Sequence, residues 1–179
     1  MNIQAAIAQV VAGQSLSRAD METVMRTVMQ GEATEAQIGG LLVGLRMKGE
    51  TIDEIVGAAS VMRSLATPVD IDTDGLIDLA GTGGDGANLF NVSTAATFVV
   101  AGAGGRIAKH GNRSVSSSSG SSDVLSALGV DLSVSPAAIA DSIASIGVGF
   151  MFAPMHHSAM KHAIGPRQQL AMRTIFNVL

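Results

Sequence analysis

The segment Asp78-Leu79-Ala80-Gly81-Thr82-Gly83-Gly84-Asp85-Gly86 predicts a buried strand that ends in a glycine-rich loop. Residues 76–80 form an apolar run of strand length directly before the glycines. Glycines let the backbone adopt positive φ and bring its N–H groups close to a ligand. Converging N–H groups bind anions, so the segment predicts a phosphate-binding loop. A tight turn without a ligand is the alternative interpretation.

Asp85 does not fit simple phosphate binding, because a carboxylate repels a phosphate. We expect it to orient the loop or to contact a metal ion or a sugar hydroxyl. Downstream, Asn91-Val92-Ser93-Thr94 precedes an Ala-rich segment, and Ser93 or Thr94 can cap a helix over residues 95–103. Such a helix would place its N-terminus, which attracts anions, beside the glycine-rich loop.

A second polar loop is predicted after a short strand at residues 106–108. Lys109, His110, Asn112 and Arg113 follow that strand. Two fixed cations with two further polar groups can bind phosphate, and a run of serines adds neutral donors. A serine run is also typical of a flexible linker. We favour the binding loop, because basic residues precede the run and a predicted helix over residues 123–129, capped by Ser121 or Ser122, follows it.

Residues 1–66 read as helices only. Ser17 can cap one helix, and two capping boxes, Thr34 with Gln37 and Thr51 with Glu54, mark the starts of two more. The methionine-rich stripe after Ser17 indicates a core or a subunit contact rather than a cofactor site. So small a helical unit has little interior, so we expect its apolar faces to pack on the next domain and on a second subunit.

Residues 67–75 are predicted to be a linker, and residues 76–179 an α/β domain with a mainly parallel sheet, because strands alternate with helices there. A weak strand is expected at residues 130–132, a helix from Ser135-Pro136 to Ile146, and a strand at residues 148–153.

Three histidines, His156, His157 and His162, follow on a predicted helix, where His157 and Lys161 would share a face. We favour a surface or supporting role for these histidines over a role as metal ligands. Gly165-Pro166-Arg167 is predicted to open a last helix. Arg167 near that N-terminus would suit a carboxylate, or else form a surface ion pair.

Composition narrows the possible functions. The 179 residues are 47% hydrophobic, with a net charge of −4 and no cysteine. An acidic chain argues against a nucleic-acid surface, and the lack of cysteine excludes a disulfide framework or thiol chemistry. No apolar run reaches the length of a membrane span, and no signal peptide is evident. We therefore expect a cytoplasmic protein that binds neither nucleic acid nor membrane.

The motifs together resemble the anthranilate phosphoribosyltransferase family. The resemblance rests on Gly81-Thr82-Gly83-Gly84-Asp85, on Asn91-Val92-Ser93-Thr94, and on Lys109-His110-Gly111-Asn112-Arg113 running on to Gly120-Ser121-Ser122-Asp123. It implies a nucleoside-phosphorylase/phosphoribosyltransferase-like fold and a homodimer through the helical domain. It also implies transfer of phosphoribosyl from phosphoribosyl pyrophosphate to anthranilate in tryptophan biosynthesis, with Mg²⁺.

The resemblance also assigns site residues. The expected donor-binding residues are Gly81, Gly84, Asp85, Leu89, Asn91, Val92, Ser93, Thr94, Lys109, His110, Gly111, Asn112, Arg113, Ser114, Val115, Ser116, Ser117 and Ser121. Those expected to bind anthranilate are Gly81, His110, Asn112, His157 and Arg167. Ser93 is the expected magnesium ligand. No residue is assigned as nucleophile or base, because the amine of anthranilate is itself the nucleophile.

Three departures from the family pattern stand out. Leu89 replaces a usual hydroxyl residue, and His156-His157-Ser158 replaces an aromatic, a histidine and a proline. The family continues beyond Leu179 into a half that holds an Asp-Glu magnesium pair, so we expect the 179-residue form alone to be inactive. The alternatives are a pyrimidine nucleoside phosphorylase, which needs a different second loop, and a nucleic-acid-binding relative, which should be basic.

Overall fold

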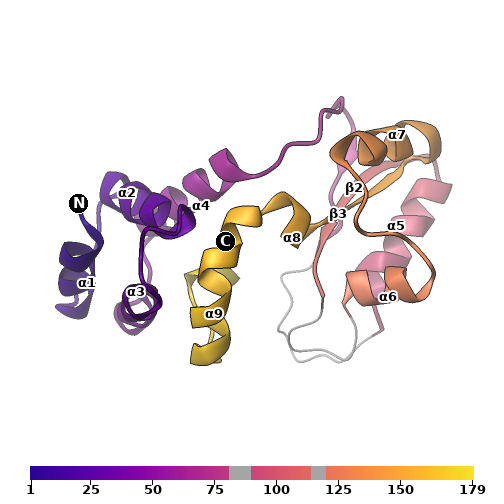
Figure 1. Ribbon diagram of the computed structural model, residues 1–179. Helices are drawn as coiled ribbons and strands as arrows, with labels where there is room; N and C mark the ends of the chain where they lie inside the picture. The colour runs from indigo at the N-terminus through magenta and orange to yellow at the C-terminus, as the bar shows by residue number, and fades with distance from the viewer. Residues whose placement is uncertain (81–89, 114–119) are drawn as a thin grey trace. The chain divides into compact units, whose positions relative to one another are not determined.

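The computed structural model describes residues 1–80, 90–113 and 120–179, and the chain forms two compact units (Figure 1). Unit 1 contains Met1–Ala66 together with His157–Leu179, and unit 2 contains Thr67–His156. The packing thus groups residues 157–179 with the helical region, whereas the sequence places them in the α/β domain. The expected class, a helical region followed by an α/β region with a parallel sheet, is confirmed.

Four helices open unit 1, and local capping explains where each begins. They are α1 (Ile3–Val11), α2 (Arg18–Met29), α3 (Glu35–Lys48) and α4 (Ile52–Leu65). Ser17 caps α2, and both predicted capping boxes are confirmed at the starts of α3 and α4. Because a cap satisfies N–H groups that have no partner inside the helix, these sequence signals mark the helix starts closely.

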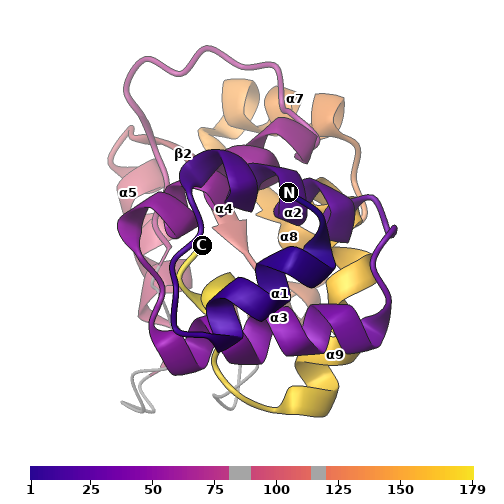
Figure 2. The ribbon, with the colours of Figure 1, turned by 90° about the vertical axis from the view of Figure 1, so that its left-hand side faces the viewer.

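The core of unit 1 is aliphatic and methionine-rich. Helix α2 packs against α4, and α1 lies beside α3 (Figure 2). The predicted stripe of α2 is buried, namely Met21, Val24, Met25, Val28 and Met29. It joins the apolar face of α3 in a single cluster of buried residues. The stripe is therefore core, and burial of this apolar area is what holds the helices together.

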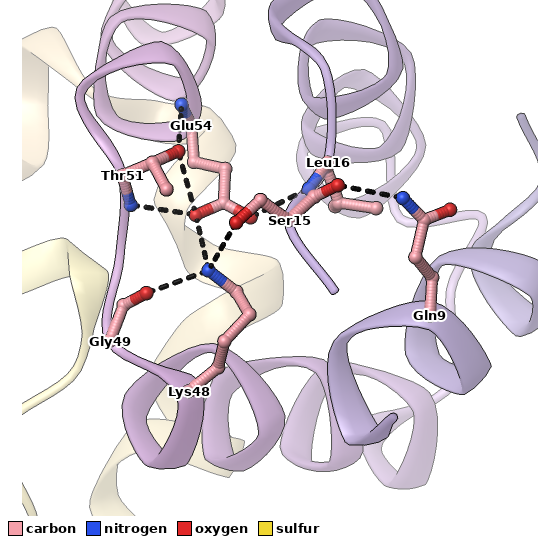
Figure 3. A network of polar contacts seen from close by, with 7 residues as sticks. All are labelled: Gln9, Ser15, Leu16, Lys48, Gly49, Thr51 and Glu54. Carbon is pink, nitrogen blue, oxygen red and sulfur yellow. Dashed lines mark hydrogen bonds and ion pairs between the residues drawn. The ribbon is translucent and has the colours of Figure 1, made fainter. Parts of the chain in front are cut away.

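A buried ion pair ties three segments of unit 1 together (Figure 3). The Glu54 side chain is fully buried and pairs with Lys48 Nζ at 2.9 Å. Glu54 also accepts hydrogen bonds from the backbone N–H groups of Leu16 and Thr51, at 2.8 and 2.7 Å. Lys48 donates to Gly49 O at 2.6 Å as well. The carboxylate thus links the start of α4 to the end of α3 and to the segment before α2.

The last helix begins earlier in the chain than the sequence predicts. The C-terminal part of unit 1 contains the 3₁₀ turn η1 (Ser158–Met160), helix α9 (Lys161–Leu170) and the 3₁₀ turn η2 (Ile175–Asn177). Pro166 lies inside α9 rather than at its start, so Arg167 is in the last turn. Ala171 ends α9 with φ 48°, the one positive φ outside glycine in the described chain. The prediction that Gly165-Pro166-Arg167 opens a helix is therefore wrong.

Unit 2 contains a parallel sheet in the order β1-β2-β3. The strands are β1 (Leu76–Ile77), β2 (Arg106–Gly111) and β3 (Val148–Phe152). The helices of this unit are α5 (Val92–Gly102), α6 (Ser121–Ala127), α7 (Pro136–Ile146) and the short α8 (Ala153–His156). Helix α7 packs on β3, and its Ile139 and Ile143 form a small core with Ala108 of β2.

Three features of unit 2 differ from or extend the sequence prediction. The expected strand at residues 130–132 is absent from this described segment, where Val130 N instead donates to Leu125 O at the end of α6. The expected linker is fastened by Arg106, whose guanidinium contacts Asp72 Oδ2 at 3.2 Å and Asp74 O at 2.9 Å. Thr67 N donates to His156 O at 2.8 Å, and His156 Nδ1 lies 3.0 Å from Thr67 O.

Candidate functional site

Lys109 is the most deeply buried cation of unit 2 within the described residues. Only 2% of it is exposed, although it was expected on a loop. It lies inside β2, because that strand runs on to Gly111 rather than stopping at residue 108. Its Nζ donates to Leu79 O, just past β1, and to Ser93 Oγ at 3.2 Å, in the first turn of α5. The parallel sheet explains the meeting, because β1 and β2 end at the same edge.

The charge of Lys109 is only partly compensated. Burial lowers the pKa of Lys109, and the nearby carboxylate of Asp78 offsets part of that effect, which leaves the pKa below its ordinary value. Asp78 Oδ1 also accepts a hydrogen bond from His110 N at 3.1 Å. Sequence reasoning did not assign Asp78 to the site. The available signal was an acid within the first apolar run and a lysine directly after the second predicted strand.

Asn91 organises the start of α5. Its Oδ1 accepts from Thr94 N at 3.1 Å, from Ser93 Oγ at 3.3 Å and from Ser121 Oγ at 3.5 Å. Asn91 is therefore the N-cap, and the expectation that Ser93 or Thr94 caps the helix is wrong. The helix consequently begins at Val92, and Ser93 lies in its first turn, within reach of Lys109. An asparagine is among the best N-cap residues, so this signal was present in the sequence.

The start of α6 lies against the end of β2. Gly120 is the N-cap, and its N–H donates to Asp123 Oδ2 at 2.8 Å, so the expected caps Ser121 and Ser122 are inside the helix. Gly111 permits the approach, because a Cβ there would lie 2.8 Å from the Phe150 ring and 3.3 Å from Ser121 Cβ. The predicted site residues Asn91, Ser93, Lys109 and Ser121 are therefore neighbours in space.

Polar atoms with unused hydrogen-bonding capacity lie at this edge. Thr94 and Ser122 are 3% and 1% exposed, and neither hydroxyl has a hydrogen-bond partner within residues 1–80, 90–113 and 120–179. Asn112 accepts two hydrogen bonds from backbone N–H groups. Its Oδ1 accepts from Arg113 N at 2.8 Å, and its backbone carbonyl accepts from Ser122 N at 3.4 Å. A ligand with many acceptor oxygens matches an edge so rich in hydroxyl and N–H groups.

The expected anthranilate residues His157 and Arg167 belong to unit 1. His157 precedes η1, and Arg167 is on α9, so the prediction that His157 and Lys161 share a face of one helix is wrong. The Arg167 guanidinium lies 5.2 Å from the ring centre of Phe176. Burial lowers the pKa of Arg167. His156, the last residue of α8, is buried, and its Nδ1 faces the backbone of Thr67 in unit 2.

Several predicted residues lie outside the described part of the chain. They are Gly81, Gly84, Asp85 and Leu89 of the first loop, and Ser114, Val115, Ser116 and Ser117 of the second. Their ligand-binding roles stay predictions.

Ser93 is the predicted magnesium ligand, and the described residues supply only part of a metal site around it. No group of three or more histidine or acidic side chains in the described segments could hold a metal ion. Ser93 Oγ accepts from Lys109 and donates to Asn91, which leaves one lone pair. One hydroxyl oxygen fits Mg²⁺, because this ion is commonly held by few protein ligands together with water and substrate phosphates.

Comparison with protein families matches both regions of the chain. Residues 4–66 match the helical bundle domain of the glycosyl transferase family, and residues 73–179 match its a/b domain. Anthranilate phosphoribosyltransferases from Teredinibacter turnerae and Cellvibrio japonicus are 68% and 67% identical over all 179 residues. Those residues make up 52% of each relative, so the chain spans about half the length of the curated relatives it matches.

Solved structures give the same relationship. Anthranilate phosphoribosyltransferase from Thermus thermophilus has a TM-score of 0.88 at 43% identity, covering 96% of this chain and 52% of that one. The enzyme from Saccharomyces cerevisiae in complex with PRPP and Mg has a TM-score of 0.89 at 28% identity, covering 99% of this chain and 53% of that one. No helix of the described residues is long and apolar enough to cross a membrane.

Proposed function

Because this chain belongs to the glycosyl transferase family, we propose that the protein containing it is an anthranilate phosphoribosyltransferase. It would transfer the 5-phosphoribosyl group of phosphoribosyl pyrophosphate to the amine of anthranilate and release pyrophosphate. The observation that carries the proposal is the buried Lys109 of β2, which donates to Leu79 O just past β1 and to Ser93 Oγ in the first turn of α5. The identity of 60–68% to relatives of that name supports it.

The donor would bind in unit 2. A pyrophosphate group would add negative charge beside the Lys109 ammonium, which the Asp78 carboxylate compensates only in part, and the N-terminus of α5 would attract the same anion. The hydroxyl groups of Ser93 and Ser121 donate to Asn91 Oδ1, and each would add a neutral hydrogen bond to the donor by turning its O–H away from that amide. The donor-binding set proposed here also includes the predicted residues of the two glycine- and serine-rich loops.

Catalysis would rest on positioning and electrostatics. The reacting carbon develops oxocarbenium character as pyrophosphate departs, so the protein has to hold both substrates and stabilise the departing charge. Lys109 would supply a fixed cation for that charge. No side chain is required as nucleophile, because the amine of anthranilate attacks the carbon. We assign no general base.

We propose that Mg²⁺ accompanies the donor and that Ser93 Oγ supplies one of its ligands. The ion would neutralise charge on the departing pyrophosphate. The described residues offer no further cluster of metal ligands. We also propose that the 179-residue chain alone makes no product above background, because it spans 52% of the relatives named anthranilate phosphoribosyltransferase.

We propose a role in acceptor binding for each of the residues that the family resemblance assigns to it, namely Gly81, His110, Asn112, His157 and Arg167. Arg167 is suited to a carboxylate, because guanidinium presents paired N–H donors. We expect Arg167→Ala in the full-length protein to raise the KM for anthranilate far more than the KM for phosphoribosyl pyrophosphate. Arg46→Ala, at an exposed position on α3, is the matched control. A change confined to the donor KM would mean that Arg167 serves the donor instead.

The overall test is the fluorescence of anthranilate with phosphoribosyl pyrophosphate and Mg²⁺, measured on the full-length protein. Consumption of anthranilate that requires both partners is expected. Phosphorolysis of thymidine without such consumption would favour a nucleoside phosphorylase instead. A gel shift on nucleic acid at moderate salt tests the nucleic-acid-binding alternative, which the net charge of −4 argues against.

We also propose a cytoplasmic homodimer formed through the helical region. Met47 and Ile52, at the end of α3 and the start of α4, are 83% and 80% exposed. Contiguous exposed apolar patches are typical of interaction surfaces, and we propose that these two side chains belong to one. Light scattering of the full-length protein should give the mass of a dimer, and the double variant Met47→Glu/Ile52→Glu should shift it toward the monomer. An unchanged dimer would exclude this surface.

A further inference from the structure

Phe176 packs its ring beneath the guanidinium of Arg167. The ring centre lies 5.2 Å from Arg167 Cζ, within the distance over which a cation and an aromatic face attract each other. Phe176 is 9% exposed and belongs to the apolar core of unit 1. The core therefore fixes the ring, and the ring presents one face to the arginine.

The backbone between these residues explains how they meet. Helix α9 ends at Ala171, whose N–H donates to Arg167 O at 3.2 Å and whose positive φ turns the chain back. Thr174 N then donates to Asn177 Oδ1 at 3.0 Å, which closes the η2 turn around Phe176. Ile175, in the same turn, is fully buried. The segment between α9 and η2 is thus held by hydrogen bonds at its start and at its end.

Arg167 has no acidic partner among the described residues, unlike three other cations. Lys48 pairs with Glu54, Arg106 with Asp72, and Arg18 with Glu22. An aromatic face attracts a guanidinium but takes up none of its in-plane N–H groups. The five donors of Arg167 thus keep their capacity for a planar acceptor, while burial lowers its pKa.

We propose that Phe176 is a positioning residue, which holds the Arg167 guanidinium in place for the carboxylate of a bound ligand. The inference rests on the proposed function to the extent that this ligand is anthranilate. A carboxylate partner from the protein would occupy the N–H groups of Arg167, whereas an aromatic face orients the cation and leaves them to the ligand.

The test compares Phe176→Leu with Phe176→Tyr in the full-length protein. Leucine keeps an apolar side chain but removes the aromatic face, and tyrosine keeps the face. We expect Phe176→Leu to raise the anthranilate KM by about three- to tenfold, with the donor KM nearly unchanged, as the strength of such a contact implies. Phe176→Tyr should retain the wild-type KM. In an Arg167→Ala background, Phe176→Leu should add nothing.

Ile175→Val is the control for a purely structural effect. It loosens the same turn and should lower the melting temperature without moving the anthranilate KM. The inference is overturned if Phe176→Leu raises both KM values equally, if Phe176→Tyr behaves like leucine, or if the two substitutions at 167 and 176 act independently.

A second measurement separates this inference from the proposed function. The Nε–H resonance of Arg167 should shift when benzoate is added to the wild type and to Phe176→Tyr, and it should shift much less in Phe176→Leu. That pattern in a protein that makes no phosphoribosylanthranilate would support a positioned carboxylate site and refute the reaction. If the Arg167 resonance of the wild type did not shift on addition of benzoate, the proposed carboxylate site at Arg167 would be refuted.

Discussion

Replacing Glu54 with glutamine measures how much the buried ion pair of unit 1 contributes to stability. Glutamine has nearly the same size, so packing is preserved while the charge is lost. The Glu54 carboxylate accepts from Leu16 N, Thr51 N, Thr51 Oγ1 and Lys48 Nζ at 2.8, 2.7, 3.1 and 2.9 Å. All four partners are donors. The amide NH₂ of glutamine would therefore face at least one donor, and the Lys48 ammonium would lose its counter-charge.

The expected cost is about 3–5 kcal/mol, the range for removing one partner of a buried ion pair. Lys48 would keep only its bonds to Gly49 O and Ser15 Oγ, at 2.6 and 3.3 Å, while its side chain is 6% exposed. Removing both charges, as in Lys48→Met/Glu54→Gln, should cost less than the sum of the single changes, because no unpaired ammonium is left behind.

Denaturant unfolding of the 179-residue chain, followed by circular dichroism at pH 7, gives the free energy. Glu22→Gln is the control, because its 2.9 Å pair with Arg18 is largely exposed and should contribute about 0–1 kcal/mol. A Glu54→Gln variant within about 1 kcal/mol of the wild type would refute the argument, since the pair would then have no more effect than a surface pair.

The contribution of Glu54 to stability should decrease as the pH falls. Burial acts to raise the pKa of Glu54, but hydrogen bonds from Lys48, Thr51 and Leu16 outweigh it, so the pKa lies below its ordinary value. The stability that the ionised carboxylate contributes is therefore complete above the ordinary glutamate pKa and is lost as the pH falls through the lowered value. The difference between wild type and Glu54→Gln should shrink over that acidic range. A difference independent of pH would contradict the assignment.

Three further predictions concern the donor, a backbone strain and turnover. Lys109→Ala in the full-length protein should weaken the binding of phosphoribosyl pyrophosphate by about 1.5–3 kcal/mol in calorimetry, because a charge-assisted hydrogen bond is lost. The control variant Lys161→Ala, at an exposed position, should leave this binding unchanged. Ala171→Gly should raise the melting temperature slightly, since glycine relieves the cost of φ 48°, about 1–2 kcal/mol for alanine, at a smaller entropic cost. The 179-residue chain alone should consume no anthranilate with saturating substrates and Mg²⁺, and activity near that of the full-length protein would contradict this.

Local signals in the sequence predicted the helical part of the fold well. The capping boxes at Thr34 and Thr51 each depend on two residues three positions apart. They therefore fix the start of a helix whatever that helix packs against. The start of α9 was missed because Pro166 looks like a first-turn proline, whereas the helix begins five residues earlier at Lys161. The packing of α9 on α3 outweighs the missing hydrogen bond, and no local pattern records that packing.

The sequence singled out residues that prove to be neighbours in space, but it did not predict their geometry. The sequence brought Lys109 and Ser93 forward as binding residues, but it placed Lys109 on a loop. A lysine in a nearly buried strand is improbable locally, and it becomes stable only because Leu79 and Ser93, far away in the sequence, provide acceptors. The role of Asp78 depends on the same pairing of β1 with β2, so it could not be read from either strand alone.

The division of the chain has a consequence for its synthesis. Translation proceeds from the N-terminus, and helices α1–α4 share their core with Ala163, Ile175 and Phe176. That core therefore lacks part of its apolar surface until all of residues 67–156 have left the ribosome, whereas unit 2 has its whole sequence available earlier. The paired hydrogen bonds between Thr67 and His156 hold the two ends of the intervening segment together. We expect this closure to reduce the entropic cost of bringing the late C-terminal helix back to partners made at the beginning.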